Sequence, residues 1–243
     1  MFKDYMRKKD TNTLKVTGAA DKLAMSFAAV KRAECPDGQV RYGDHIGMMS
    51  EGTRGAFSAD PDERSGVFAC TGQAKDEVLP SCRNTFRVIC HEGVDQEVLR
   101  YGDKIKINTI PMFDQDLMLS SERTIPGFAS PLTKSQMVVF SPYDTYNNVW
   151  QVLCADSMRR HETLGLPCLI GERFILKHCF TNNLLAAMPN TYPNEFGLEH
   201  EVCCKQFKHV GKVGSISQEY MGKAGPTMLQ PSVVDPNVWV FSS

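Results

Sequence analysis

The sequence has little net charge, no long apolar runs and no glycosylation sites, and each absence narrows what it can encode. Its 243 residues carry a formal net charge of −1, which gives no overall electrostatic case for binding nucleic acid or an anionic membrane. The first residues are polar and of mixed charge, and no apolar run approaches the length of a membrane span. No Asn-x-Ser/Thr site occurs. We therefore expect no nucleic-acid partner, no membrane partner and no secretory route.

The number of cysteines indicates a protein outside the secretory pathway. There are nine of them, an odd number that cannot be paired completely within one chain. Reduced thiols are typical of the cytosol and cytoskeleton, where we expect the protein to reside.

The motifs of several enzyme classes are absent. Gly211-Lys212-Val213-Gly214-Ser215 lacks the spacing and strand-to-helix context of a phosphate-binding loop. His91-Glu92 and His161-Glu162 are not followed by the second histidine of a zinc protease, and there is no Gly-x-Ser-x-Gly nucleophile turn. We expect a binding or scaffold protein without catalytic residues or a cofactor.

A short segment with glycine, then an acid, then alternating apolar residues occurs three times. The three copies are Val40–Met48, Leu99–Ile107 and Ile170–Leu176. Glycine permits a tight turn, the acid can accept hydrogen bonds from nearby amides, and the alternation predicts a strand with one buried face.

A second marker follows each copy of the first. It consists of an asparagine, a spacer, an aromatic residue and an aliphatic residue two positions later, with the aromatic at Phe86, Trp150 and Trp239. Further strands are predicted between the markers, at 66–70, 117–120, 137–140, 183–187 and 201–207.

The two markers, in the same order three times, predict an all-β fold built from three units. One unit cannot bury its own apolar face, so we expect the units to close around a pseudo-threefold axis as a β-trefoil of about twelve strands. The predicted units span about 37–95, 96–160 and 161–243. The acids of the first marker are interpreted as turn acids that lie apart, and not as a catalytic pair. The structural keystones of the repeats are Tyr42, Gly43, Asp44, Tyr101, Gly102, Asp103, Gly171, Glu172, Phe86, Trp150 and Trp239.

The pattern of residues 1–36 predicts a helical N-terminal arm. Apolar residues from Ala20 to Val30 recur at three- and four-residue steps, which predicts an amphipathic helix that ends near Pro36. A shorter helical piece is predicted before it. The arm is net basic, so we expect it to dock on an acidic partner. Its candidate partner-binding residues are Phe2, Tyr5, Met6, Arg7, Lys8, Lys9, Leu14 and Lys15.

The third unit differs from the others in two ways. From about Met188 to Pro236 it is rich in Gly, Pro, Asn and Ser, which predicts a long insertion that is irregular over much of its length. It also contains a group of potential metal ligands, whose only close pair, Cys203-Cys204, lacks the spacing that zinc sites use. We interpret the group as buried thiols and surface histidines. A metal-dependent enzyme that uses these residues is the alternative, which a metal analysis of the purified protein would test. The group comprises Cys168, His178, Cys179, His200, Cys203, Cys204 and His209.

With these residues assembled, the markers resemble MIR-type β-trefoil repeats, and four stretches resemble the cilia- and flagella-associated protein 161 family. The stretches are Phe2–Asp10, Arg83–Phe86, Val98–Ser121 (at its two ends) and His178–Ala187. The most family-specific residues are His178, Cys179, Thr181 and Asn182.

This resemblance implies a structural microtubule inner protein that stabilises the axoneme. Its expected place is the lumen of the A-tubule of ciliary and flagellar doublet microtubules, bound to α/β-tubulin and other inner proteins. The chain begins close to the arm motif and ends directly after the last predicted strand, so contacts made by longer termini in the family are not expected here.

The alternative is a MIR-like trefoil that binds glycans or proteins as a module of the secretory pathway. That alternative predicts a secretory signal, which the first residues do not resemble.

Overall fold

The computed structural model describes residues 23–60, 67–71, 78–92, 97–110, 116–123, 129–205 and 236–243, together with Met6 and Asp21. This part of the chain is mostly β-strand, as the sequence predicted, with short helical pieces between strands.

The strands fall four to each predicted unit. The first unit holds β1 (His45–Ser50), β2 (Phe57–Asp60), β3 (Val67–Thr71) and β4 (Phe86–Cys90). The second holds β5 (Lys104–Thr109), β6 (Met118–Ser121), β7 (Gln136–Ser141) and β8 (Trp150–Cys154). The third holds β9 (Arg173–His178), β10 (Leu185–Asn194), β11 (Gly197–Cys204) and β12 (Trp239–Ser242). The helical pieces are η1 (Cys82–Asn84), η2 (Tyr146–Asn148) and α3 (Arg160–Thr163). Only β2 had no counterpart among the predicted strands.

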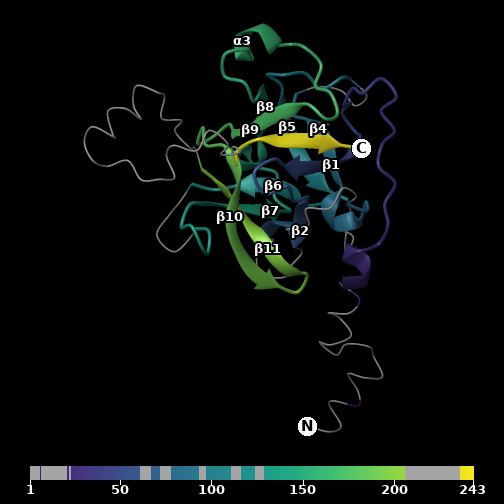
Figure 1. The fold of residues 1–243 in the computed structure, drawn as a ribbon, viewed down its shortest axis with the longest axis vertical. Helices are drawn as coiled ribbons and strands as arrows, with labels where there is room; N and C mark the ends of the chain where they lie inside the picture. The colour runs from purple at the N-terminus through teal and green to yellow at the C-terminus, as the bar shows by residue number, and fades with distance from the viewer. Residues whose placement is uncertain are drawn as a thin grey trace, which may run out of the picture.

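Six strands close into a ring. The order β5-β4-β1-β12-β9-β8 is continuous, and β8 pairs with β5 to complete it. Every pairing around the ring is antiparallel. Figure 1 shows the C-terminal strand β12 (yellow) beside β1, so the last strand of the chain seals the ring to the first.

The remaining strands form three hairpins, β2–β3, β6–β7 and β10–β11. The hairpins also pair with one another, through β3–β7, β11–β3 and β11–β7. Each unit therefore contributes two strands to the ring and one hairpin to this second set (Figure 1).

Three backbone hydrogen bonds tie the units to one another in a cycle. The amide of Val40 donates to the carbonyl of Cys168, that of Cys168 to Leu99, and that of Leu99 back to Val40, at 3.1, 2.8 and 2.8 Å. All three residues are buried, so each amide and carbonyl needs the partner that another unit supplies.

The glycine of each first marker lies in the left-handed region. Gly43, Gly102 and Gly171 have φ of 93°, 101° and 81°, which residues with a Cβ rarely adopt. Their amides donate to the carbonyls of Val88, Val152 and Phe241, at equivalent positions in the last strand of each unit. The turn thus fixes where each unit's first strand starts relative to its last.

The aromatic residues of the second marker fill the core. Phe86, Trp150 and Trp239 are at most 1% exposed. The indole of Trp150 donates to the carbonyl of Leu119 at 2.9 Å, and that of Trp239 to Leu185 at 3.1 Å. Each tryptophan therefore ties its ring strand to the hairpin of its own unit.

The asparagine of the second marker closes the turn before the strand. Asn84 and Asn148 accept hydrogen bonds from the amides of Ser81 and Thr145 through Oδ1, at 2.9 and 2.8 Å. Asn237 instead donates to the carbonyls of Leu185 and Lys205. This bonding explains why an asparagine precedes each aromatic residue.

The predicted helical arm is wrong beyond residue 27. Among the described residues of this segment only Met6, Asp21 and 23–26 are helical, and Phe27 is 59% exposed where a buried helix face was expected. The chain then runs alongside residues 80–82, where Ala29 pairs with Ser81. These backbone bonds outweigh the helical periodicity, because they satisfy amides and carbonyls that the short helix leaves unpaired.

Arg32 fastens this segment to the seam of the ring. Its guanidinium donates to both oxygens of Asn84, to Thr85 Oγ1 and to Ser242 Oγ, at 3.1 to 3.3 Å. A Cβ on Gly47 would lie 2.5 Å from Arg32 Cζ and 2.6 Å from Ser242 Oγ. Gly47 is therefore required for the arginine to reach its partners.

The predicted irregular insertion is wrong for residues 188–200, whereas the strand predicted from residue 201 is present in β11. Residues 188–204 complete the hairpin β10–β11, in which Pro189 and Pro193 are exposed on a strand at the end of the sheet order. Proline is tolerated there because an edge strand has positions whose amides need no partner. The rest of the predicted insertion, 206–235, lies outside the described residues.

A buried ion pair anchors this hairpin to the first unit. Arg83 Nη2 lies 2.8 Å from Glu199 Oε1, with both side chains at most 3% exposed, and its guanidinium stacks 3.7 Å from the ring centroid of Phe196. Glu201 accepts from the amides of Leu132 and Thr133. The hairpin is therefore bound to both other units by charged groups that require their partners.

Trp239→Ala is expected to destabilise the protein by about 3–5 kcal/mol, because it removes a fully buried indole and leaves a cavity. Chemical denaturation of the purified chain measures the change. Tyr143→Ala is the matched control, since that side chain is 74% exposed and its loss should cost less than about 0.5 kcal/mol. An unchanged unfolding midpoint for Trp239→Ala would show that β12 is misassigned.

Candidate functional site

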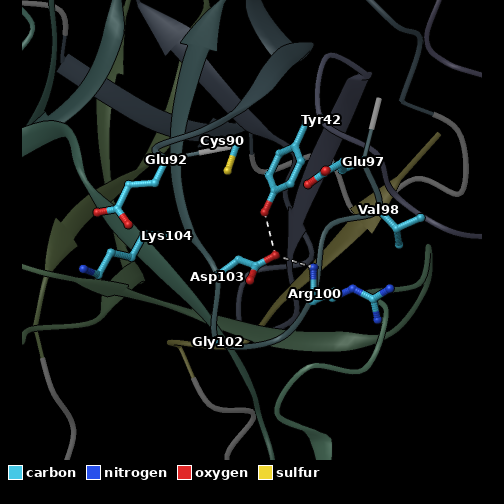
Figure 2. A pocket seen from close by; sticks show the side chains of 9 residues that line it. All are labelled: Tyr42, Cys90, Glu92, Glu97, Val98, Arg100, Gly102, Asp103 and Lys104. Atoms are coloured by element: carbon cyan, nitrogen blue, oxygen red, sulfur yellow. Dashed lines mark hydrogen bonds between the residues drawn. The ribbon is translucent and has the colours of Figure 1, made fainter. Parts of the chain in front are cut away.

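A polar pocket of about 780 Å³ opens where the first unit meets the second (Figure 2). It lies between the end of β4, the start of β5 and the two Tyr-Gly-Asp turns. Its lining residues are Tyr42, Cys90, Glu92, Glu97, Val98, Arg100, Gly102, Asp103 and Lys104.

The tyrosine of one repeat and the acid of the next meet in this pocket. Tyr42 Oη donates to Asp103 Oδ2 at 2.6 Å, and the same oxygen accepts from the amide of Arg100 at 2.9 Å (Figure 2). Burial raises the pKa of Tyr42, and the hydrogen bond to Asp103 raises it further. The phenol therefore stays protonated and acts as a strut between two units, not as a base or nucleophile.

Two acids of the first marker form hydrogen bonds within their turns, and two bond to a tyrosine of the preceding unit. Asp44, like Asp103, accepts a hydrogen bond from the amide three residues before it, which is the turn role that the sequence predicted. Asp103 also joins two units through Tyr42. At the next junction Tyr101 Oη donates to Glu172 Oε2 at 3.2 Å, whereas the third repeat has Ile170 in place of the tyrosine.

The remaining pocket residues offer charges of both signs. Glu92, Glu97, Arg100 and Lys104 are exposed, and Arg100 Nη1 also donates to the carbonyl of Gly165 at 2.7 Å. These groups suit a polar ligand held by hydrogen bonds. Sequence reasoning missed the pocket because Cys90, Glu92 and Glu97 belong to no motif and converge only in the fold.

The segment of His178, Cys179, Thr181 and Asn182 forms the turn between β9 and β10. His178 is fully buried against Trp150, with 4.9 Å between ring centroids. Its Nε2 lies 2.9 Å from the carbonyl of Asn147, and its Nδ1 lies 2.9 Å from Thr181 Oγ1. Asn182 has a φ of 61°, a left-handed conformation that asparagine tolerates.

These contacts assign the proton of His178. Only a protonated Nε2 can bond to the carbonyl of Asn147, so in the neutral ring Nδ1 accepts from Thr181 and from Gln136 Nε2. Burial, the larger effect, lowers the pKa of His178, while the bond to the Asn147 carbonyl raises it. His178 is therefore a neutral structural residue that joins the second and third units.

The described members of the group of potential metal ligands in the third unit do not converge. Among the described residues no group of three or more His, Cys, Asp or Glu side chains is arranged to hold a metal. Cys204 belongs to the main core, whereas its neighbour Cys203 packs with Ala186 and Met188 on the other side of the sheet. Burial raises the pKa of both thiols, which disfavours the thiolates that zinc would need. His209 lies outside the described residues.

Most of the predicted arm site cannot be placed. Phe2, Tyr5, Arg7, Lys8, Lys9, Leu14 and Lys15 lie outside the described residues, and Met6 is 38% exposed. In the part of the chain that is described, no helix is both long and apolar enough to cross a membrane.

Comparison with curated proteins identifies relatives in three vertebrates. The chain is 25% identical over 242 residues to cilia- and flagella-associated protein 161 of Bos taurus, covering 91% of this chain and 75% of that protein. The identity is 25% with the Danio rerio protein and 26% with the Mus musculus protein, over 228 and 160 residues. No protein-family model matches the chain. The matches confirm the resemblance that the four sequence stretches predicted.

Solved structures share the fold. The SDF2-like protein from Arabidopsis thaliana superposes with a TM-score of 0.58 at 15% identity, covering 84% of this chain and 95% of that one. A Caenorhabditis elegans protein of unknown function superposes with a TM-score of 0.59 at 13% identity, covering 86% and 99%. At these identities the likeness concerns the fold alone.

His178 should make the folded state sensitive to acid. Because its pKa is lowered on folding, the unfolded chain binds more protons, and stability falls as the pH drops below about 6.5, the ordinary histidine value. His178→Gln should be less stable at neutral pH by about 1–3 kcal/mol and should lose less stability between neutral and acidic pH. Thermal melts across this range measure both effects. His161→Gln, an exposed control, should follow the parent protein, and parallel pH profiles for all three proteins would refute the assignment.

Proposed function

We propose, from the kinship of this chain with cilia- and flagella-associated protein 161, that it is a structural microtubule inner protein of the ciliary or flagellar axoneme. The carrying observation is similarity over 91% of this chain and 75% of the bovine relative. The proposed position is the luminal wall of the doublet A-tubule. There it would bind α/β-tubulin and neighbouring inner proteins and stabilise the doublet.

The architecture supports a scaffold role. The closed ring and its three hairpins support the β-trefoil that the repeats predicted. Buried links such as Tyr42–Asp103 and Arg83–Glu199 hold the units together. A compact scaffold of this kind presents several surface segments at fixed positions, which suits many shallow contacts repeated along a lattice.

The proposed role is non-catalytic. Tyr42 and His178 are committed to links between units, and the buried thiols Cys203 and Cys204 have raised pKa values. In this proposal the basic N-terminal residues add contacts to an acidic partner. Arg32 belongs with the ring and not with those contacts, because its four hydrogen bonds end on Asn84, Thr85 and Ser242.

The tagged chain, expressed in ciliated cells, should remain with isolated axonemes after a high-salt wash. At about 1 M salt the screening length is about 3 Å, so exposed ion pairs no longer hold a protein on an outer surface. A luminal protein is also enclosed by the microtubule wall. Immunoblots of the washed axonemes and the extract measure retention, with an outer-surface axonemal protein as the control.

A variant that lacks residues 1–22 keeps Arg32 and should fold normally, yet be retained less. Release of the intact parent protein by a mild salt wash would contradict the luminal position. If the truncated variant is retained as well as the parent, only the proposed role of the arm is contradicted, and the luminal position still stands.

A glycan-binding module is the second candidate, and the polar pocket of Figure 2 is the observation that favours it. Under the axonemal proposal, a glycan array probed with the purified chain should give no hit. A hit that is lost in Glu97→Gln would favour the glycan module instead, because that exposed carboxylate lines the pocket without supporting the Tyr42–Asp103 link.

A further inference from the structure

Four neighbouring strands of the ring contain no acidic residue, and three of them carry basic side chains. β4, β5, β8 and β9 are adjacent in the sheet, and neither aspartate nor glutamate occurs in any of them. Their cations alternate with buried apolar residues and therefore face outward. They are Arg87, Lys104, Lys106, Arg173 and Lys177.

The strand register aligns two of these cations in one row. Lys104 of β5 is paired with Gln151 of β8, and Gln151 is paired with Lys177 of β9. Two strand spacings place the two lysine Cα atoms about 9–10 Å apart on the same face. Both lysines also lie near Cys179, where each favours the thiolate, although burial has the larger effect and raises the pKa of that thiol.

Local carboxylates neutralise only part of this charge. Lys106 is paired with Asp144 at 2.7 Å and Arg173 with Glu51 at 2.6 Å. Glu92 lies on the same side of the pocket as Lys104 (Figure 2). Within the described residues, however, neither Lys104 nor Lys177 forms an ion pair, so the row keeps an excess of positive charge.

Exposed aromatic rings lie beside the basic row. Tyr146 and Phe180 are 50% and 55% exposed, and their ring centroids are 6.4 Å apart. Tyr146 also lies 6.5 Å from His91, whose amide donates to the carbonyl of Lys104. Aromatic side chains are enriched at protein interfaces, because they bury a large apolar area with few freely rotating bonds.

We propose that this face of β4, β5, β8 and β9 is a docking surface for an acidic, extended protein segment. The lysine row attracts the carboxylates, and Tyr146 and Phe180 pack against the apolar parts of the segment. A protein partner fits better than nucleic acid, because the chain has a pI of about 6.6 and lacks the overall basic charge of nucleic-acid-binding domains. The inference rests on the proposed function, for which it supplies a contact surface separate from the N-terminal arm.

The test uses the purified full-length chain and a fluorescent, glutamate-rich peptide of about twelve residues, which is long enough to cross four strands. Binding is measured by anisotropy at low and physiological salt. Lys104→Glu/Lys177→Glu should weaken binding at least about tenfold at low salt. Lys31→Glu/Lys134→Glu makes the same change in net charge at exposed lysines elsewhere and should bind like the parent. Phe180→Ala should also weaken binding, which purely electrostatic attraction would not explain.

Three results would overturn the docking surface: no binding by the parent at low salt, equal loss in both double variants, or tighter binding of an RNA oligonucleotide than of the peptide. Thermal melts verify that every variant is folded. Axoneme retention is scored separately. Retention without peptide binding removes this surface and leaves the proposed function standing. Peptide binding without any axonemal localisation removes the proposed function and leaves the surface.

Discussion

The fold depends on the cycle of backbone hydrogen bonds through Val40, Leu99 and Cys168. Each bond joins a different pair of units, so the cycle is complete only when all three units are in place. The groups are buried, and a lost partner would cost the desolvation of an amide and a carbonyl without compensation. This cycle makes one cooperative body of three units, none of which can bury its own apolar face.

The three junctions between units are not equivalent, and each is held by different side-chain contacts. The first junction has Tyr42–Asp103 and an open polar pocket. The third has Ile170 at the tyrosine position and gains other links, namely the Arg83–Glu199 pair and the Arg32 bonds to Ser242. The missing Tyr–acid link is thus offset by the ion pair between η1 and β11 and by Arg32 from the segment before the repeat.

The repeated elements were predictable because each marker residue has a local physical task. Gly43 needs a left-handed turn, and Asn84 and Trp239 perform hydrogen bonding and packing that few other residues can replace. The helical arm was mispredicted beyond residue 27 because the periodicity of 20–30 gave no sign of the pairing between Ala29 and Ser81. The continuation of β10 beyond residue 187 was missed because proline argues against a strand unless its edge position is known.

The candidate surfaces were unpredictable for a different reason. Lys104 and Lys177 are distant in sequence, and only the register through Gln151 places them in one row. The His178 segment, in contrast, stands out in the sequence, yet the imidazole of His178 is buried and links two units. Among the residues with the strongest family resemblance, His178 therefore supports the fold. Contacts with partners depend instead on side chains that the fold leaves exposed. A change at His178 should act through stability, whereas a change at Lys104 should act through binding, and this separation lets the two roles be measured independently.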